Sequence, residues 1–323
     1  MTSDETPTAA NVEIYLGLIR DAAKLSAIQT AAMAITSSND LTEAAAAYED
    51  LGTRLRELED FEDLALDELI GRYCDRMSDK TPPDYLRFGI EQLDNLLNVS
   101  RGKFVILAAD SSVGKTALAL QFAYRMAEAG KKVGFFSLET DADTLTDRLL
   151  AEVQTAGVNL PRTKHKALSD HDWKQVTAAA NRQAARRIRL LNKFRTVDQI
   201  RGRTIMRGFD VVFIDYVQLL EAPGRERWDI VTNISIGLHR MAQDLGVTVI
   251  GLSQITPASK DQKRAPSKDD LRESRQLKHD ADVILIMSIS QEGSGMFREL
   301  QVAKNKDGPL GRLLLDFDPE HMT

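Results

Sequence analysis

The sequence predicts an α/β fold in which a mostly parallel, twisted sheet carries helices on both faces and ends in a β-hairpin. A helical hairpin and a linker helix precede this sheet. Three observations predict it. After residue 85, apolar runs of strand length alternate with helical patterns, as in parallel sheets. The run at 103–108 breaks into a small polar turn and then into a helical pattern. Residues 11–59 repeat apolar side chains at three- and four-residue steps.

Composition is that of an ordinary globular protein. The chain has 323 residues, of which 43% are hydrophobic, so it can form one large domain and a smaller one. No apolar run approaches the roughly 18 residues of a membrane span, and the N-terminus lacks the features of a signal peptide. We therefore expect a cytoplasmic protein. The single cysteine, Cys74, is expected to face a core from a helix, and the five histidines show no metal-ligand spacing.

Charge is distributed unevenly along the chain. Residues 1–100 hold 8 Lys and Arg against 20 Asp and Glu, a net charge of −12, whereas the remaining 223 residues hold 34 against 28, a net charge of +6. An acidic segment is suited to protein contacts and a basic body to polyanions, although +6 is too mild to establish nucleic-acid binding by itself.

The N-terminal third predicts three helices and a linker. Helical patterns cover 11–35, 41–59 and 64–77, and the stretch 78–84 is rich in helix breakers. We expect a helical hairpin over 1–60, a linker helix and linker over 61–84, and a larger domain over 85–323. Three helices bury too little surface to form a core, so we expect them to pack on neighbouring subunits. The alternative is a tail that folds on its own larger domain.

The turn after the first strand has the spacing of a phosphate-binding loop. Ala109–Thr116 fits the Walker A pattern, with Ala in place of the first Gly, and a strand precedes it and a helix follows it. Lys115 is then expected to neutralise the β- and γ-phosphates of ATP, and the Thr116 hydroxyl to hold Mg²⁺. The alternative is a Gly-Lys-Thr helix start in an ordinary α/β protein. The predicted nucleotide-binding residues are Ser111, Ser112, Val113, Gly114, Lys115, Thr116 and Ala117.

Two carboxylates follow strands of the predicted sheet. Glu139 lies just beyond the second strand and Asp215 ends the fourth, at the carboxyl edge where such sheets bind ligands. Asp215 has the Walker B pattern and is predicted to support Mg²⁺, and Glu139 is predicted to deprotonate the attacking water. The alternative for Glu139 is a helix N-cap. The predicted parallel strands are 103–108, 133–138, 188–192, 210–215, 247–252 and 282–287.

The C-terminal third adds a polar loop and a hairpin. Gln254 ends the fifth strand, where it is suited to sense the γ-phosphate or is simply a satisfied amide. The long polar loop 255–270 runs into Asp270–Arg275, where basic side chains and backbone donors can meet phosphates. A solvated charge run is the alternative. Residues 299–315 predict a hairpin that turns at Asp307-Gly308.

Together these motifs resemble the bacterial replicative DNA helicases of the DnaB type, whose motor domain has the RecA-like fold and works as a ring of six. The resemblance covers residues 85–318, and residues 12–35 and 62–77 resemble the end of the family's N-terminal domain and its linker helix. The matching segments are Phe88-Gly89-Ile90, Leu93-Asp94, Ala109–Thr116, Phe136–Glu139, Ile214–Leu219, Leu252–Gln254, Asp270–Ser274, Asp280–Asp282 and Lys304–Pro309.

The resemblance implies an ATP-hydrolysing, 5′-to-3′ DNA helicase that uses Mg²⁺ and moves on single-stranded DNA. By that resemblance Lys115 and Glu139 are catalytic, Thr116 and Asp215 hold the metal, and Gln254 couples hydrolysis to the DNA loop. Lys306 stands where the family carries an arginine finger, with Lys304 two residues before it. Lysine lacks the bidentate fork of arginine, so activation of the neighbouring site is expected either to be weaker or to be shared between Lys306 and Lys304. The implied DNA-contacting residues are Arg272, Glu273, Ser274 and Arg275, the last in place of the family's usual glycine.

The resemblance also implies a helicase loader or primase as partners. The globular beginning of the family's N-terminal domain, which serves primase docking, matches no part of this sequence. Two other functions remain open: a RecA/RadA-like recombination or repair ATPase that forms filaments, and a regulatory ATPase ring like KaiC, the circadian-clock ATPase.

Overall fold

The computed structural model describes residues 12–38, 40–57, 65–81, 83–151, 156–158, 160–183, 187–255, 275–290, 297–318 and 320. The chain contacts divide it into two compact units, Met1–Pro82 and Pro83–Thr323. Among the helices of the described residues, none has the length and apolar character that crossing a bilayer requires.

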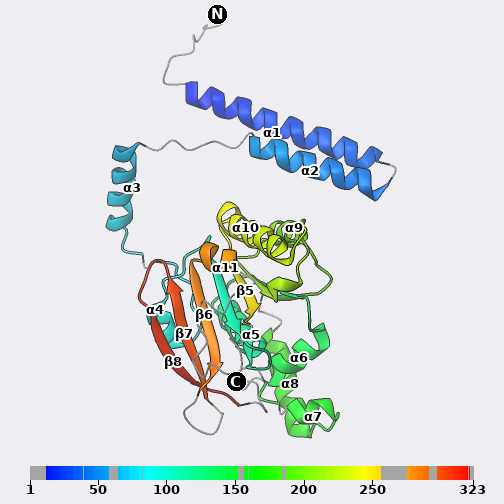
Figure 1. The fold of residues 1–323 in the computed structure, drawn as a ribbon, viewed down its shortest axis with the longest axis vertical. Helices are drawn as coiled ribbons and strands as arrows, with labels where there is room; N and C mark the ends of the chain where they lie inside the picture. The colour runs from blue at the N-terminus through cyan, green and yellow to red at the C-terminus, as the bar shows by residue number, and fades with distance from the viewer. Residues whose placement is uncertain are drawn as a thin grey trace, which may run out of the picture. The chain divides into compact units, whose positions relative to one another are not determined.

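The first unit begins with a helical hairpin. Helices α1 (Val12–Ser37) and α2 (Leu41–Glu57) lie side by side, as the apolar spacing predicts (Figure 1). Asp40 starts α2, because its Oδ1 accepts the backbone N–H groups of Thr42 at 2.8 Å and Glu43 at 2.9 Å. These bonds satisfy two donors that have no partner inside the helix.

Helix α3 (Leu66–Ser78) follows in the same unit, and none of its residues is buried. The expectation that Cys74 faces a core is therefore wrong, since the thiol is exposed and this helix has no core side. The large apolar side chains that α3 exposes are spaced three to four residues apart along most of it: Leu66, Leu69, Ile70, Tyr73 and Met77.

The second unit contains a sheet of eight strands within the described residues, in the order β3-β2-β4-β5-β1-β6-β7-β8. Strands β1 to β6 pair in parallel, and β7 and β8 add an antiparallel hairpin. The predicted strands are confirmed, with ends that differ by two residues at most. The strands are β1 (Phe104–Ala109), β2 (Val133–Ser137), β3 (Ile188–Leu191), β4 (Val211–Asp215), β5 (Thr248–Gln254), β6 (Val283–Ile289), β7 (Phe297–Asn305) and β8 (Gly311–Asp316).

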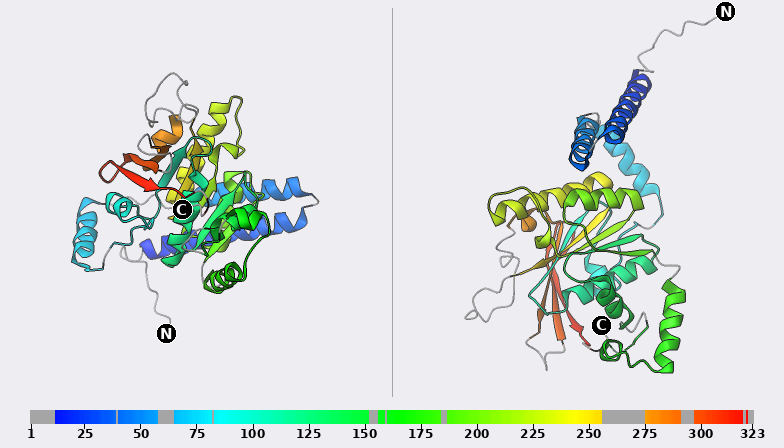
Figure 2. Two further views of the ribbon diagram at one scale, coloured as in Figure 1. Left: turned by 90° about the horizontal axis from the view of Figure 1, so that it is seen from below. Right: turned by 90° about the vertical axis from the view of Figure 1, so that its right-hand side faces the viewer.

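Helices cover both faces of this sheet, which gives the predicted three layers (Figure 2). Helices α4 and α5 lie on one face, and α9, α10 and α11 lie on the other. The helices of this unit are α4 (Glu91–Leu96), α5 (Lys115–Glu128), α6 (Ala142–Ala151), α7 (Leu160–Lys164), α8 (Asp170–Gln183), α9 (Val197–Arg207), α10 (Arg227–Leu245) and α11 (Arg275–Asp280), with the short 3₁₀ helix η2 (Val217–Leu219).

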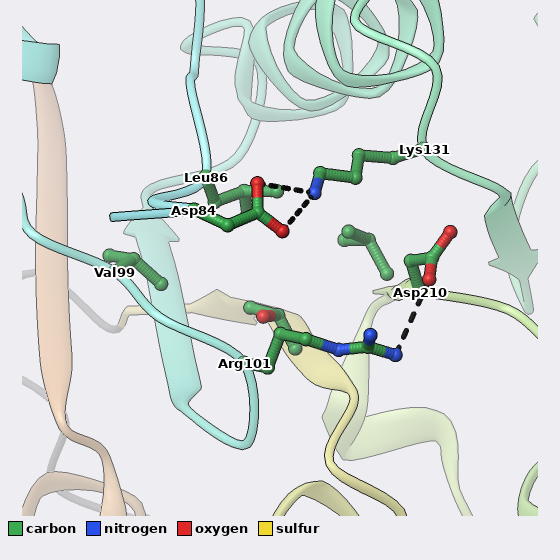
Figure 3. Close-up of a pocket in the computed structure, with 8 residues that line it drawn as sticks. Asp84, Leu86, Val99, Arg101, Lys131 and Asp210 are labelled. Atoms are coloured by element: carbon green, nitrogen blue, oxygen red, sulfur yellow. Dashed lines mark hydrogen bonds and ion pairs between the residues drawn. The ribbon is translucent and has the colours of Figure 1, made fainter. Parts of the chain in front are cut away.

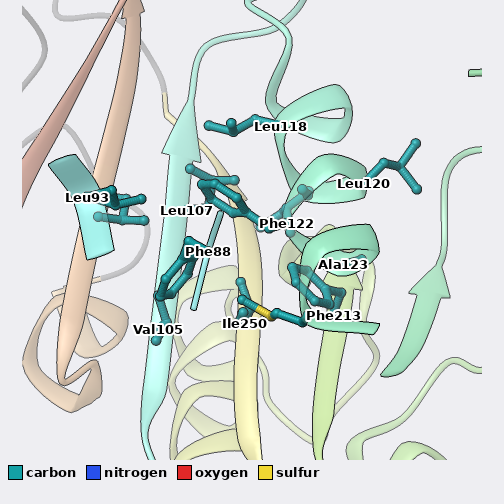
Figure 4. Close-up of a cluster of buried hydrophobic side chains, with 14 of the residues drawn as sticks. Phe88, Leu93, Val105, Leu107, Leu118, Leu120, Phe122, Ala123, Phe213 and Ile250 are labelled. Carbon is teal, nitrogen blue, oxygen red and sulfur yellow. The ribbon is translucent and has the colours of Figure 1, made fainter. Parts of the chain in front are cut away.

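The core forms because successive side chains of a strand point to opposite faces. In β1, Val105 and Leu107 join the cluster beneath α5, where Phe122 meets Phe88 with ring centroids 5.0 Å apart (Figure 4). Ile106, between them in sequence, joins the cluster beneath α10. All six residues of β1 are buried, so the strand that leads to the phosphate loop is anchored on both faces.

Ion pairs hold the amino edge of the sheet. Lys131 donates to both carboxylate oxygens of Asp84, at 2.7 and 2.6 Å, and Arg101 lies 3.4 Å from Asp210 (Figure 3). Such partly exposed pairs stabilise a fold by roughly 0–1 kcal/mol each. They fasten the segment before β1 at the edge opposite to the phosphate loop.

Candidate nucleotide-binding site

The phosphate loop occupies residues 110–114, between the end of β1 at Ala109 and the start of α5 at Lys115. Its backbone has positive φ at Ser112 (61°) and Gly114 (110°). Left-handed residues next to right-handed ones turn backbone N–H groups toward one side and form anion-binding concavities. The N-terminus of α5 adds its free N–H groups and the positive end of its dipole. The loop therefore has the backbone geometry of a phosphate site.

Three side chains that the sequence assigned to this site come together at the loop. The Thr116 hydroxyl donates to Asp215 Oδ2 at 2.8 Å, which joins the start of α5 to the end of β4. Asp215 is 1% exposed, and within the described residues its buried Oδ1 has no hydrogen-bond partner. The Lys115 ammonium lies 5.3 Å from the centroid of the Tyr216 ring.

Burial acts against the charges of this site. The pKa of Asp215 is raised, mainly because burial disfavours the carboxylate, while the Thr116 hydrogen bond and the charge of Lys115 act in the opposite direction. The pKa of Lys115 is lowered, again mainly by burial, against the attraction of Asp215, Glu139 and Asp110. A hydroxyl oxygen beside an unsatisfied carboxylate oxygen suits Mg²⁺, which prefers hard oxygen ligands. These residues fit a magnesium-bound phosphate.

Glu139 lies beyond β2 at the same edge, and its charge acts on both Lys115 and Tyr216. It is exposed. It does not cap the helix that follows, because the backbone N–H of Thr144 donates to Asp141 at 2.8 Å. The capping alternative therefore does not describe Glu139, whereas its role as a base stays a prediction.

Gln254 ends β5 and is exposed. Gln218, which the sequence places in the matching segment Ile214–Leu219 but to which it assigns no role, fixes the Gln254 backbone. Gln218 is buried, and its side chain donates to Ser253 Oγ at 2.8 Å and to the Gln254 carbonyl at 3.0 Å. The sequence feature that could have indicated this role is the position of Gln218, three residues after Asp215. In the structure this position lies on η2. Gln218 thereby joins the ends of β4 and β5.

Sequence reasoning also missed one residue of the hairpin and one residue just after it that contact the phosphate loop. Arg298, near the start of β7, is 8% exposed and donates from Nε to the Val113 carbonyl at 2.8 Å. Phe317 follows β8, and its ring lies against Gly114. No local pattern indicates either contact, since Arg298 and Val113 are 185 residues apart.

Lys306 lies at the opposite edge of the sheet from the phosphate loop. In the sheet register Val105 of β1 pairs with Val283 of β6, which pairs with Asn305 of β7, so Lys306 follows at the amino end of β1. Its ammonium is 3.6 Å from the buried carboxylate of Asp282, and the Lys306 side chain is 63% exposed. Six strand residues at about 3.3 Å each separate the two edges by roughly 20 Å. Lys306 is therefore not part of the phosphate site of its own chain.

Lys304 does not share the surroundings of Lys306. Its ammonium donates to the carbonyls of Lys278 at 2.9 Å and His279 at 2.8 Å. These carbonyls belong to the last turn of α11, where unpaired acceptors and the negative end of the dipole favour a cation. The two lysines therefore have different contacts within the chain: one binds α11 and the other faces outward.

The predicted DNA-contacting segment lies only partly within the described residues. Arg275 begins α11 and is exposed. The loop 256–270 and Arg272, Glu273 and Ser274 lie outside the described residues. Because α11 follows this segment directly, Lys304 connects the hairpin to the element that ends the predicted DNA loop.

The fold and the site together define a RecA-like P-loop domain, with a phosphate loop after β1, Asp215 at the end of β4 and Glu139 just beyond β2. The DnaB-like helicase C-terminal domain model matches residues 86–323. The chain belongs to the DnaB-like helicase family.

Relatives and solved structures agree with this assignment. The chain is 32% identical over 246 residues to a Chlamydia muridarum protein named "Probable plasmid replicative DNA helicase", with 73% of this chain and 54% of that protein covered. It is 30% identical over 250 residues to the replicative DNA helicase DnaB of Geobacillus stearothermophilus, with 72% and 54% covered. The chain thus spans about half the length of these curated relatives.

Two solved structures are similar in fold. One, described as an ATPase domain, has a TM-score of 0.74 and 30% identity, covering 81% of this chain and 98% of that one. A DnaB-like replicative helicase, described with its interactions with primase, has a TM-score of 0.78 and 27% identity, covering 95% of this chain and 76% of that one. The second likeness includes most of the N-terminal unit.

Proposed function

We propose that this chain is the motor of a ring-shaped DNA helicase that hydrolyses ATP at subunit interfaces and moves 5′ to 3′ on single-stranded DNA. The observation that carries the proposal is the opposite placement of Lys115 and Lys306. A phosphate site at one edge of the sheet and an outward-facing lysine at the other are what a head-to-tail ring requires.

The site residues have distinct proposed roles. The loop amides and Lys115 bind the β- and γ-phosphates, and Thr116 and Asp215 hold Mg²⁺, which neutralises charge on the phosphates when bound. Glu139 takes the proton of the attacking water, because it is exposed at the same edge and is not used as a helix cap. Gln254 relays the state of the γ-phosphate along β5 toward the loop that follows it.

Lys306 supplies positive charge to the ATP site of the next subunit. Its exposed ammonium can leave Asp282 for a phosphate, since Asp282 keeps a second cation, Lys103, at 3.8 Å. Lys304 supports this finger indirectly through α11. This assignment narrows the catalytic role to Lys306 and gives Lys304 a positioning role.

The segment around Arg272–Arg275 is the proposed contact to DNA, with Arg275 exposed at the start of α11. The exposed apolar side chains of α3 support the proposal that the N-terminal unit packs on neighbouring subunits. The proposed assembly is a hexamer in the cytoplasm. A loader or primase remains a proposed partner, and the solved structure described with primase supports the second of these.

Strand displacement on a forked DNA substrate tests the function. We expect the full chain with ATP and Mg²⁺ to release the labelled strand, with hydrolysis stimulated by single-stranded DNA, and Lys115→Ala to do neither. Electron microscopy of the same sample should show closed rings. DNA-coated filaments without displacement would favour a recombination ATPase, and rings that neither bind DNA nor displace a strand would favour a regulatory ATPase.

A further inference from the structure

A buried arginine of the C-terminal hairpin holds the phosphate loop from outside. Arg298, on β7, lies opposite Ile289 of β6 at the carboxyl edge of the sheet. It donates from Nε to the Val113 carbonyl at 2.8 Å. Its Nη1 donates to the Phe297 carbonyl at 3.2 Å. A guanidinium is costly to bury unless its N–H groups are paired, so the position of this side chain depends on these carbonyls.

The bond to Val113 fixes the direction of the next amide. A trans peptide unit is planar, and its C=O and the following N–H point in opposite directions. Because Arg298 holds the Val113 carbonyl on one side, the Gly114 N–H is turned to the other side. Gly114 is the residue before α5, so its N–H is among the donors without a partner inside that helix.

Phe317 contacts both Arg298 and the phosphate loop. The Arg298 guanidinium carbon lies 4.4 Å from the centroid of the Phe317 ring. A Cβ atom on Gly114 would come within 3.2 Å of that ring. The loop is therefore held at Val113 by a hydrogen bond from β7 and at Gly114 by an aromatic ring that directly follows β8.

We propose that Arg298 is a positioning residue of the nucleotide site, which holds the Val113 carbonyl so that the Gly114 N–H is presented to the phosphates of the bound nucleotide. This inference rests on the proposed nucleotide-binding function. It also assigns a different role to each end of β7. One end shapes the phosphate loop of its own chain, and the other leads to Lys306, which serves the neighbour.

A matched pair of variants tests the role of the donor. In Arg298→Gln the amide nitrogen occupies the place of Nε and keeps a neutral donor, whereas Arg298→Met fills a similar volume without any donor. We expect R298Q to bind a fluorescent ADP analogue within about threefold of the parent, and R298M to bind roughly tenfold more weakly than R298Q. Equilibrium titration of the full chain measures both.

Two controls separate positioning from a scaffold role. Arg312→Met changes an exposed arginine of β8, whose partner Glu299 is 3.5 Å away, and should leave the affinity unchanged. Unfolding temperatures without nucleotide should differ by only a few degrees between R298Q and R298M, since both fill the buried space.

The outcomes distinguish this inference from the function on which it rests. Equal affinities of R298Q and R298M would overturn it, whether both match the parent or both are weak. If one variant is too unstable to titrate, the two variants are compared by the rise in unfolding temperature that saturating ADP produces. Equal rises would again overturn the inference. If the parent and Lys115→Ala both fail to bind nucleotide, the proposed function is wrong instead.

Discussion

Gly114→Ala isolates the contribution of the loop conformation to nucleotide binding. Gly114 has a φ of 110°, and an added Cβ would lie 3.2 Å from Cε2 and 3.4 Å from Cζ of Phe317. A non-glycine residue held in such backbone geometry costs about 1–3 kcal/mol. The ring must also move by a few tenths of an ångström. In the variant, the phosphate loop should therefore adopt the conformation that binds nucleotide in a smaller fraction of the molecules.

The expected loss follows from the fraction of molecules that keep the loop conformation. An apparent dissociation constant rises as the competent fraction falls, so about 1–3 kcal/mol corresponds to a roughly 5- to 150-fold weaker affinity. Isothermal titration with ADP and Mg²⁺ measures this directly. Adding Phe317→Ala should recover only a small part of the loss, because removing the ring does not change the φ that residue 114 must adopt.

Gly130→Ala is the matched control. Gly130 follows α5 at its other end, has a φ of 87°, and has nothing within 4 Å of an added Cβ. It should lower the unfolding temperature through the same backbone strain, while the affinity for ADP stays at the parental value. Parental affinity in Gly114→Ala, or an equal loss of affinity in Gly130→Ala, would refute the reasoning.

Three further predictions concern the charged groups of the site. Glu139→Gln should keep the parental affinity for ATP and lose turnover at least 100-fold, because the amide cannot accept a proton; steady-state hydrolysis at the parental rate would contradict it. Asp215→Asn should raise the unfolding temperature of the nucleotide-free chain at pH 7.5, because a folded pKa above the ordinary value of 3.8 means that the ionised carboxylate destabilises the fold. This difference from the parent should shrink as the pH falls through the raised pKa, and calorimetry that finds the variant less stable at pH 7.5 would refute it. Mixing Lys306→Ala with Lys115→Ala subunits should restore part of the ATP turnover that each lacks alone, because a mixed interface joins an intact loop to an intact finger; turnover no higher than the sum of the separate variants would argue against a finger in trans.

The sequence was sufficient to predict the layers of the fold and the residues that meet at the carboxyl edge of the sheet. The apolar runs that end at Ala108 and Asp215 predict buried parallel strands, and parallel strands bring their carboxyl ends together. Thr116 and Asp215 meet for this reason, although they are 99 residues apart. The helix that follows β1 is equally local, since Gly114 and Lys115 mark where it begins.

The contacts of single polar side chains across the fold could not be predicted. The pattern of 299–315 predicts a hairpin, yet it does not say that Arg298 reaches a loop carbonyl or that Lys304 reaches the end of α11. Such contacts depend on which strand lies beside which, and on the direction in which a long side chain extends. Cys74 shows the converse case. Its helical spacing is amphipathic, but amphipathicity does not provide the surface that would bury it.

The location of Lys115 and Lys306 at opposite edges of one sheet has a stoichiometric consequence. In a head-to-tail assembly each added subunit completes one ATP site, and an open chain keeps one loop without a finger and one finger without a loop. An open chain of n subunits then has n − 1 complete sites, and closure supplies the last one. Specific activity should therefore rise with oligomer size and reach its limit only when the two ends meet. By the same reasoning, a ring that opens at one interface to admit DNA would have one ATP site without a finger at that interface.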